Sequence, residues 1–585
     1  GIFFCVRSHL FAEAIQFIES DSGAKSDQSC LFWHVYCLCR SGKKTKASSM
    51  LGKSGASVLG SVLCDLLQMK INDDRDLADL TRNIKSWSPR DLEIFTYYCI
   101  FEDLTTYIEE VRGIRGAECA LGIEGLIAKV AELKKTKSSD ETLFASESEV
   151  TGKRFGELSA QYPNSIIVNI VNLDFCAVSN QLSEMNKVVE SLAKQVKSED
   201  LLGLFKLRLL TGQRNWEALD SCIGTITKRN ADNVMALEYQ LLSKLIKDRL
   251  TSVSFECFRR ILAIVEREYG WDNPELCLRT IRTVVYLVGN ESAYVAHAID
   301  VLRKGMMTLS DNYDLMELLG YLYLLSGQHT KADEMFQIAT TCNSEQSSAF
   351  LRLIQIKLLT GEFAEAESSL EFFQEICSTL KTQSTEINLI KSCLLFRKSI
   401  SEQDTPESAD QPNQRMLESQ EHFSRAIEQI KSKFKNEIFG IDFLHEVNPS
   451  FIITICQSFF GQLNLSFRLL SLKTRSLAPK PAFSGKLIGL MEQLSVEIAS
   501  NAEITKFLAR YFLSSGDHEK ASFYINRFHQ GNSDDEAMHI ASLMNALLMF
   551  NEGLTDLEGV NKVYNSILSV NFAIEHNFAF SYLTA

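Results

Sequence analysis

A fixed spacing between small residues in the middle of the chain limits, more than any other feature, what this chain can fold into. Gly361 follows Gly327 by 34 residues, and Ala366 follows Ala332 by the same interval. The apolar residues on either side of each glycine recur with the helical period, so each copy predicts a helix, a turn and a second helix. The turn requires the conformational freedom of glycine, and the helix crossing requires a side chain as small as alanine. We therefore expect stacked helix pairs.

The same pattern recurs outside this central region. The five-residue step from glycine to alanine occurs again at 42–47 and 516–521, and the phrase FAEA begins at Phe11 and at Phe363. A period of 34 residues with these positions is typical of the tetratricopeptide repeat. We therefore expect an all-α fold, a right-handed α-solenoid of degenerate helix pairs. The positions predicted to be structural in these repeats are Phe11, Ala14, Gly42, Ala47, Gly320, Tyr323, Gly327, Ala332, Phe336, Ala339, Gly361, Phe363, Ala366, Leu370, Gly516 and Ala521.

The organisation expected from this pattern is one continuous solenoid over residues 1–585. Each unit of a solenoid packs mainly on its neighbours, so a long chain needs no internal domain boundary. Residues 135–150 and 401–419 are predicted to be exposed or disordered loops, and residues 476–485 form an interruption that contains two prolines. The chain starts at Gly1 without a methionine and shows no polar capping helix at its end, so we expect a segment of a longer protein.

The composition argues against nucleic acid and membrane partners. The formal net charge is −14, and the densest basic clusters lie at 42–46, 133–137 and 430–435. Short clusters on an acidic chain are typical of solvated helix ends, so no nucleic acid is expected as a partner. The longest apolar runs are far shorter than the roughly 20 residues of a membrane span. The 15 cysteines lie mostly in apolar helical stretches, which indicates reduced thiols in a cytosolic compartment.

No group of residues stands in a recognisable catalytic arrangement. The stretch GKSGAS at 52–57 resembles the end of a phosphate-binding loop, but Ala47 stands where the first glycine is required. Cys30, His34 and Cys37 lie on one face of a predicted helix, where either a soft metal or the packing of small side chains would suit them. The spacing lacks a CxxC pair and favours packing. We therefore expect no enzymatic activity, no cofactor and no metal site.

The order of short motifs over residues 271–460 goes beyond a generic repeat. It runs from WDNPEL at 271–276, through a repeat with Gly320 and Tyr321 and a repeat ending in LEFFQEI, to FGIDFLHEVNPSF at 439–451. This succession resembles the tetratricopeptide repeat protein 21 family, the all-repeat subunit of intraflagellar transport complex A. The family-like positions include Asn273, Pro274, Gly440, Asn448 and Pro449.

The resemblance implies a non-enzymatic scaffold of cilia and flagella. Such a subunit supports assembly of complex A, retrograde transport and the entry of membrane proteins into the cilium. The implied partners are the other subunits of complex A, complex B trains and adaptors for membrane cargo. The implied locations are the axoneme, the basal body, the cytoskeleton and the cytoplasm. The residues by themselves indicate only protein binding along a solenoid. A repeat scaffold or co-chaperone subunit of another cytosolic machine, such as the anaphase-promoting complex, therefore stays open as the alternative.

Overall fold

A computed structural model of the chain describes most of its residues from the start to about residue 548. The described residues are 2–20, 28–51, 62, 84–102, 104–112, 114, 117–137, 141–163, 165–179, 181–196, 199–247, 252–271, 274–343, 347–378, 385–403, 414–436, 449–460, 484–497, 501–531, 540–542, 544–545 and 548.

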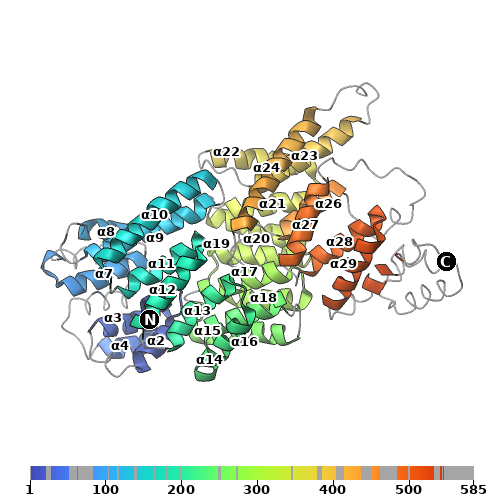
Figure 1. Cartoon of the computed structure of the whole chain (residues 1–585). Helices are drawn as coiled ribbons and strands as arrows, with labels where there is room; N and C mark the ends of the chain where they lie inside the picture. The colour runs from blue at the N-terminus through green and yellow to red at the C-terminus, as the bar shows by residue number, and fades with distance from the viewer. Residues whose placement is uncertain are drawn as a thin grey trace. The chain divides into compact units, whose positions relative to one another are not determined.

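Every regular element among the described residues is a helix, so the all-α expectation is confirmed (Figure 1). The first part of the chain contains α1 (Ile2–Arg7), α2 (Phe11–Ser20), α3 (Gln28–Arg40), α4 (Lys44–Leu51), η2 (Ile84–Ser86), α7 (Pro89–Phe101), α8 (Thr105–Val111), α9 (Glu118–Lys137), α10 (Glu141–Gln161), α11 (Ile166–Val178), α12 (Leu182–Gln195), α13 (Glu199–Gly212) and α14 (Trp216–Arg229). The chain continues with α15 (Val234–Lys247), α16 (Ser252–Tyr269), α17 (Glu275–Val288), α18 (Ser292–Met306), α19 (Tyr313–Leu325), α20 (His329–Cys342), α21 (Ser347–Thr360), α22 (Phe363–Ser378), α23 (Thr385–Gln403), α24 (Gln414–Asn436), α26 (Pro449–Phe460), α27 (Ser484–Glu497), α28 (Ala502–Ser515) and α29 (His518–Gly531).

Consecutive helices pack on one another as pairs, among them α11 with α12, α13 with α14, α19 with α20, and α28 with α29. Local signals set the limits of such a pair. Before α19, the Asn312 side chain accepts a hydrogen bond from the Leu315 amide at 2.9 Å, which satisfies a free donor at the helix start. After α19, Gly327 adopts φ 72°, which turns the chain into α20. The repeat chemistry therefore positions each helix against the next.

The chain divides into two compact units. The first comprises Gly1–Gln240, Arg260–Thr280 and Asn436–Gly440, and the second comprises Leu241–Arg259, Ile281–Lys435 and Ile441–Ala585. Boundaries between the units fall within α15, α16 and α17 and at the last residue of α24. A buried cluster in the first unit shows how a pair is held, because residues of α13 and α14 interdigitate there with the start of α15. Its members are Leu204, Leu207, Leu219, Ile223, Ile226 and Ala236. The single continuous solenoid over residues 1–585 stays a prediction.

The loop predicted at residues 135–150 is wrong over most of its length. Helices α9 and α10 cover it except for residues 138–140, which lie outside the described part. Ser148 and Thr151 are buried on α10 together with Phe155. Small polar residues thus occupy buried helix positions that the apolar pattern left blank. The polar composition of this stretch hid an amphipathic helix.

The loop predicted at residues 401–419 is also wrong at its two ends, where α23 and α24 extend into it. The hydroxyls of Ser392 and Ser419 each donate to the other residue's backbone carbonyl at 2.8 Å. A buried polar pair therefore anchors α24 where the sequence shows few apolar residues. Residues 404–413 lie outside the described part. The interruption predicted at 476–485 lies outside it as well, except for the first two residues of α27.

Candidate functional site

Glycine occupies the turn at four of the predicted repeat positions. The φ angle is 73° at Gly42, 72° at Gly327, 82° at Gly361 and 78° at Gly516. Glycine enters this left-handed region without the strain that a Cβ brings. In the less regular repeat at α13 and α14, Arg214 takes the left-handed conformation instead, with φ 52°. In the repeats with the five-residue step from glycine to alanine, glycine therefore allows the left-handed turn without strain.

The predicted alanine and phenylalanine positions lie inside helix pairs. Ala332, Phe336 and Ala339 on α20 are fully buried. The other predicted positions that are buried are Phe11, Ala14, Ala47, Tyr323, Ala366, Leu370 and Ala521. Phe363 is half-buried. Of the family-like positions, Pro449 begins α26 and Pro274 directly precedes α17, whereas Asn273, Gly440 and Asn448 lie outside the described residues.

Gly320 lies where α19 meets α20, and its lack of a side chain is a packing requirement. A Cβ at this position would lie 2.8 Å from Cε1 of Phe336. Two further glycines, which the sequence analysis did not single out, have the same role. A Cβ at Gly122 would lie 2.9 Å from a Leu158 methyl, and a Cβ at Gly203 would lie 3.0 Å from an Ile226 methyl. A glycine inside an otherwise apolar helix is the signal that identifies such sites.

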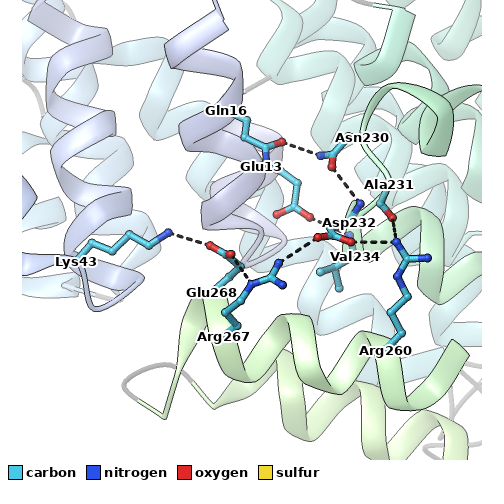
Figure 2. Close-up of polar contacts among 10 residues, drawn as sticks. All are labelled: Glu13, Gln16, Lys43, Asn230, Ala231, Asp232, Val234, Arg260, Arg267 and Glu268. Atoms are coloured by element: carbon cyan, nitrogen blue, oxygen red, sulfur yellow. Dashed lines mark hydrogen bonds and ion pairs between the residues drawn. The ribbon is translucent and has the colours of Figure 1, made fainter. Parts of the chain in front are cut away.

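Within the first unit, a polar junction joins the start of the chain to residues 230–234 and 260–269 (Figure 2). Its centre is Glu13 on α2, which is only 3% exposed. One oxygen of its carboxylate accepts a hydrogen bond from the Val234 backbone N–H at 3.1 Å, and the other accepts from the Tyr269 hydroxyl at 2.6 Å. Both partners are donors, so the site suits a carboxylate. The polar junction consists of Glu13, Gln16 and Lys43 on one side and Asn230, Asp232, Val234, Arg260, Arg267, Glu268 and Tyr269 on the other.

The buried position of Glu13 affects its titration. Burial raises the pKa of the Glu13 carboxyl, and the hydrogen bond from Tyr269 opposes this shift. Burial also raises the pKa of the Tyr269 hydroxyl well above its usual value. The phenol therefore keeps its proton and remains the hydrogen-bond donor. Among the residues drawn in Figure 2, no basic side chain forms a hydrogen bond or an ion pair with Glu13.

An alternating chain of charges forms the edge of the polar junction. Arg260 and Arg267 both donate to the carboxylate of Asp232, at 3.0 and 3.1 Å. Arg267 also donates to Glu268 at 2.9 Å, and Glu268 accepts from Lys43 at 2.9 Å. The bonds from Arg260 and then Arg267 lower the pKa of Asp232, and the bond from Lys43 lowers that of Glu268. These side chains are partly exposed, so salt screens their attraction.

We expect Glu13→Gln to raise the free energy of unfolding of the first unit at neutral pH. The amide keeps the size of the side chain and removes a buried charge whose pKa burial raises. Its oxygen accepts from the Val234 N–H, and the Tyr269 hydroxyl must turn to accept from its NH2. A carboxyl with a raised folded pKa costs stability above that pKa. The folded state regains this stability as the pH falls toward the unfolded value of 4.5. Each pKa unit of difference corresponds to about 1.4 kcal/mol.

Denaturant unfolding of both proteins between about pH 5 and 8 measures this effect. The advantage of the Glu13→Gln variant should shrink as the pH falls, because the wild-type carboxyl becomes protonated. Glu13→Ala is the control, since it leaves the Val234 N–H and the Tyr269 hydroxyl without an acceptor and should lose about 1–3 kcal/mol. An advantage that grows on acidification would contradict a raised pKa.

In the second unit, an ion cluster joins α17, α19 and α21, which are the first helices of three successive helix pairs. Arg282, Glu317 and Arg352 follow one another at intervals of 35 residues on α17, α19 and α21. Arg282 donates to one Glu317 oxygen at 3.2 Å, and Nε of Arg352 lies 3.9 Å from the other. The Arg352 guanidinium stacks over the ring of Tyr321 at 5.1 Å and donates to Gln355 at 3.0 Å. Glu317 and Arg352 are buried, so their charges need partners of opposite sign. Glu317 has both arginines, and Arg352 has Glu317 and the field of Glu386.

A cavity of about 310 Å³ in the second unit lies beside the ring of Tyr321. Its lining includes Tyr286, Tyr321, His329, Thr454 and Glu503. Nδ1 of His329 has no hydrogen-bond partner among the described residues. Aromatic rings, the Thr454 hydroxyl and the Glu503 carboxylate therefore line one cavity.

The metal-like and phosphate-like stretches do not gain support from the described part of the chain. No group of histidines, cysteines and carboxylates there has the geometry to hold a metal ion. Nε2 of His34 lies 3.4 Å from Glu19 instead. Burial raises the pKa of the Cys37 thiol well above its usual value and that of Cys39 to about 11. Residues 52–57 lie outside the described part. Within the residues that the structure describes, no helix has the length and apolar character needed to cross a membrane.

Comparison with known proteins finds similarity over residues 263–541. Residues 263–541 match the model of the second ARM domain of tetratricopeptide repeat protein 21. Tetratricopeptide repeat protein 21B of Xenopus laevis is 20% identical over 254 residues, which are 43% of this chain and 18% of that protein. Tetratricopeptide repeat protein 21A of Homo sapiens is 21% identical over 264 residues, which are 44% of this chain and 19% of that protein. The aligned part therefore spans less than a fifth of these relatives.

Two solved structures align with nearly the whole chain at low similarity. One belongs to the APC/C hetero-tetramer Cut9-Hcn1, with a TM-score of 0.33 and 11% identity, over 99% of this chain and 94% of the other. The other belongs to Naa15/Naa10 bound to HypK-THB, with a TM-score of 0.23 and 10% identity, over 97% of this chain and 99% of the other.

Helix pairs with glycine turns and buried alanine crossings define a helical-repeat scaffold of the tetratricopeptide type. The matched region contains both clean repeats, with Gly320 and Phe336 at their contact, and the Pro449 segment. Residues 263–541, just under half of the chain, are similar to the tetratricopeptide repeat protein 21 family.

Proposed function

We propose that this protein is a non-enzymatic scaffold subunit of intraflagellar transport complex A. In this role it supports assembly of the complex, retrograde transport along the axoneme and the entry of membrane proteins into the cilium. It acts through contacts with the other complex A subunits, with complex B trains and with cargo adaptors. Its site of action is the cilium or flagellum, from the basal body along the axoneme, with a pool in the cytoplasm.

The observation that carries this proposal is the family match over residues 263–541. The same region holds the ordered motifs that resemble the complex A subunit. Stacked helix pairs present a long surface, so one subunit can contact several others along its length.

Affinity purification of the tagged full-length protein from ciliated cells tests the proposal, with its companions identified by mass spectrometry and its position imaged. We expect the complex A subunits as companions and a signal at the ciliary base and along the axoneme. Recovery of chaperone or cell-cycle components with empty cilia would overturn the ciliary assignment.

Two tryptophan variants make the purification specific to the matched repeats. Ala332→Trp forces a large ring into a fully buried helix crossing and should separate α19 from α20. Thr330→Trp adds the same ring two residues away at an exposed position. We expect the first variant to lose companions and the second to retain them. Equal retention by both would show that this helix pair does not organise the complex.

A further inference from the structure

The cavity beside Tyr321 combines an exposed rim with a buried wall. Asn290 and Gly327, which lie in the turns before α18 and α20, are exposed residues of its lining, whereas Pro449 and Asn501 are buried. Pro449 begins α26, and Asn501 is the cap residue before α28. The volume of about 310 Å³ is at the lower end of the range for ligand sites, so the cavity suits a small group that enters from solvent.

The Asn501 amide is a polar group of this wall with unused hydrogen-bonding capacity. Its oxygen accepts a hydrogen bond from the Ile504 N–H at 3.2 Å, which fixes which end of the amide is the nitrogen. The NH2 group has no hydrogen-bond partner among the described residues, although Asn501 is only 2% exposed. Gly289 leaves room for this group, because a Cβ there would lie 3.0 Å from Nδ2 of Asn501. The cavity wall therefore contains a buried donor that lacks an acceptor.

The Ser450 hydroxyl is a second donor of this kind, and the ion cluster sets its direction. Arg352 donates to Oε1 of Gln355 at 3.0 Å, so the Gln355 amide must use its NH2 toward α26. That NH2 donates to Oγ1 of Thr454 at 2.9 Å and to Oγ of Ser450 at 3.4 Å. Ser450 Oγ is thus the acceptor in its bond, and its proton finds no acceptor in the described part of the chain. It can donate to a ligand in the cavity.

The lining also contains an acceptor. Oε1 of Glu503 accepts from Asn290 at 3.0 Å and from Lys506 at 3.3 Å, whereas Oε2 has no partner among the residues that the structure describes. The Lys506 ammonium offsets the charge of this carboxylate. Nδ1 of His329 is buried without a partner, and it donates or accepts according to the tautomer of the ring. The cavity therefore offers two donors, one acceptor and one group that can be either.

A primary carboxamide is the chemical group that matches this set. Its oxygen accepts two hydrogen bonds and its NH2 donates two, which satisfies Asn501, Ser450, Glu503 and His329 together. A guanidinium or an ammonium only donates, so it would leave the Asn501 and Ser450 donors without an acceptor. A carboxylate only accepts and would face Glu503 with a like charge. A hydroxyl has one proton and two lone pairs, which leaves one of the four groups unsatisfied.

We propose that this cavity binds the carboxamide of a glutamine or asparagine side chain that a partner protein presents. The side chain enters at the exposed rim formed by Asn290 and Gly327, and the partner's backbone stays outside. The half-buried Leu325 and Leu359 supply apolar surface for its methylene groups. The assignment rests on the cavity alone and stands or falls separately from the ciliary role.

Titrations of the purified chain followed by saturation-transfer NMR test the proposal, with blocked amino acids as probes. N-acetylglutamine methylamide carries the carboxamide. The corresponding glutamate, methionine and threonine derivatives share its backbone groups and carry a carboxylate, an apolar chain and a hydroxyl. We expect the glutamine probe to bind at least about tenfold more tightly than each of the others, because each leaves a buried polar group unsatisfied. Equal binding of all the probes, or no binding of the glutamine probe at about 10 mM, would overturn the proposal.

Glu503→Gln supplies a sharper test, because it should reverse the preference. The new amide keeps an oxygen for Asn290 and presents an NH2 to the ligand in place of an acceptor. It also leaves the Lys506 ammonium without its carboxylate. The glutamate probe should gain at least about tenfold in affinity, and the glutamine probe should lose a similar factor. Glu519→Gln makes the same change at an exposed position of α29 and should leave the order of the probes unchanged.

Ser450→Ala keeps the proposal testable if Glu503→Gln does not fold, which circular dichroism decides. It removes one donor from the first turn of α26 and should weaken binding of the glutamine probe by about threefold to tenfold. Binding of the methionine probe should stay the same, because it makes no hydrogen bond there. A glutamine preference that is unchanged in a folded Glu503→Gln or Ser450→Ala chain would show that the probe binds elsewhere, and the assignment would be wrong.

Discussion

Glu317→Ala should lower the free energy of unfolding of the second unit by about 3–5 kcal/mol, the usual cost of removing one partner from a buried ion pair. Glu317 is 4% exposed, and its carboxylate lies between Arg282 and Arg352. Without it, the buried Arg352 guanidinium keeps its bond to Gln355 and loses the carboxylate 3.9 Å from its Nε, so that only the field of Glu386 still offsets its charge. Chemical denaturation followed by circular dichroism measures the loss.

Asp314→Asn is the matched control for this prediction. Asp314 also approaches Arg282, at 3.4 Å, but its side chain is 52% exposed. Removal of its charge should cost less than about 1 kcal/mol, because water already screens the pair. Replacement of both Glu317 and Arg352 by methionine should recover much of the stability that Glu317→Ala loses. Equal losses in Glu317→Ala and Asp314→Asn would contradict a buried pair.

Gly320→Ala should destabilise the α19–α20 pair by about 1–3 kcal/mol through overpacking. The new Cβ would lie 2.8 Å from Cε1 of Phe336, and that ring is fully buried, so it must shift within the packed interior. Thermal unfolding of the variant measures the cost. The expected sign is opposite to that of an ordinary glycine-to-alanine change inside a helix, which stabilises.

Gly489→Ala supplies that ordinary case in the same unit. Gly489 lies within α27, and nothing stands within 4 Å of a Cβ built there, so the change should stabilise by about 0.5–1 kcal/mol. Phe336→Leu should partly rescue Gly320→Ala, with a coupling of about 0.5–3 kcal/mol between the two positions. Additive effects of the two changes would show that the contact does not limit the packing.

The helical nature of the chain and its helix pairs were predictable because their causes are local. A glycine turn such as Gly327 and a small crossing residue such as Ala332 leave a periodic trace over one repeat. The order of several such segments indicated the similarity of residues 263–541 to the tetratricopeptide repeat protein 21 family. The helix at α10 was missed for the same reason, because its buried face carries Ser148 and Thr151 and leaves no apolar period to detect.

The sequence by itself determined which segments form helix pairs, where they turn and which known family residues 263–541 resemble. Only the tertiary structure decided which charges are buried and which distant segments meet. Glu13 and Tyr269 are 256 positions apart, and no local pattern indicates that they share a hydrogen bond. Their pairing depends on how small rotations between successive helix pairs add up along the chain. The ion cluster of Arg282, Glu317 and Arg352 has a visible period of 35 residues, yet its burial depends on the packing around it. Local periodicity therefore predicts the repeats, and packing decides the contacts by which this protein is proposed to bind partners.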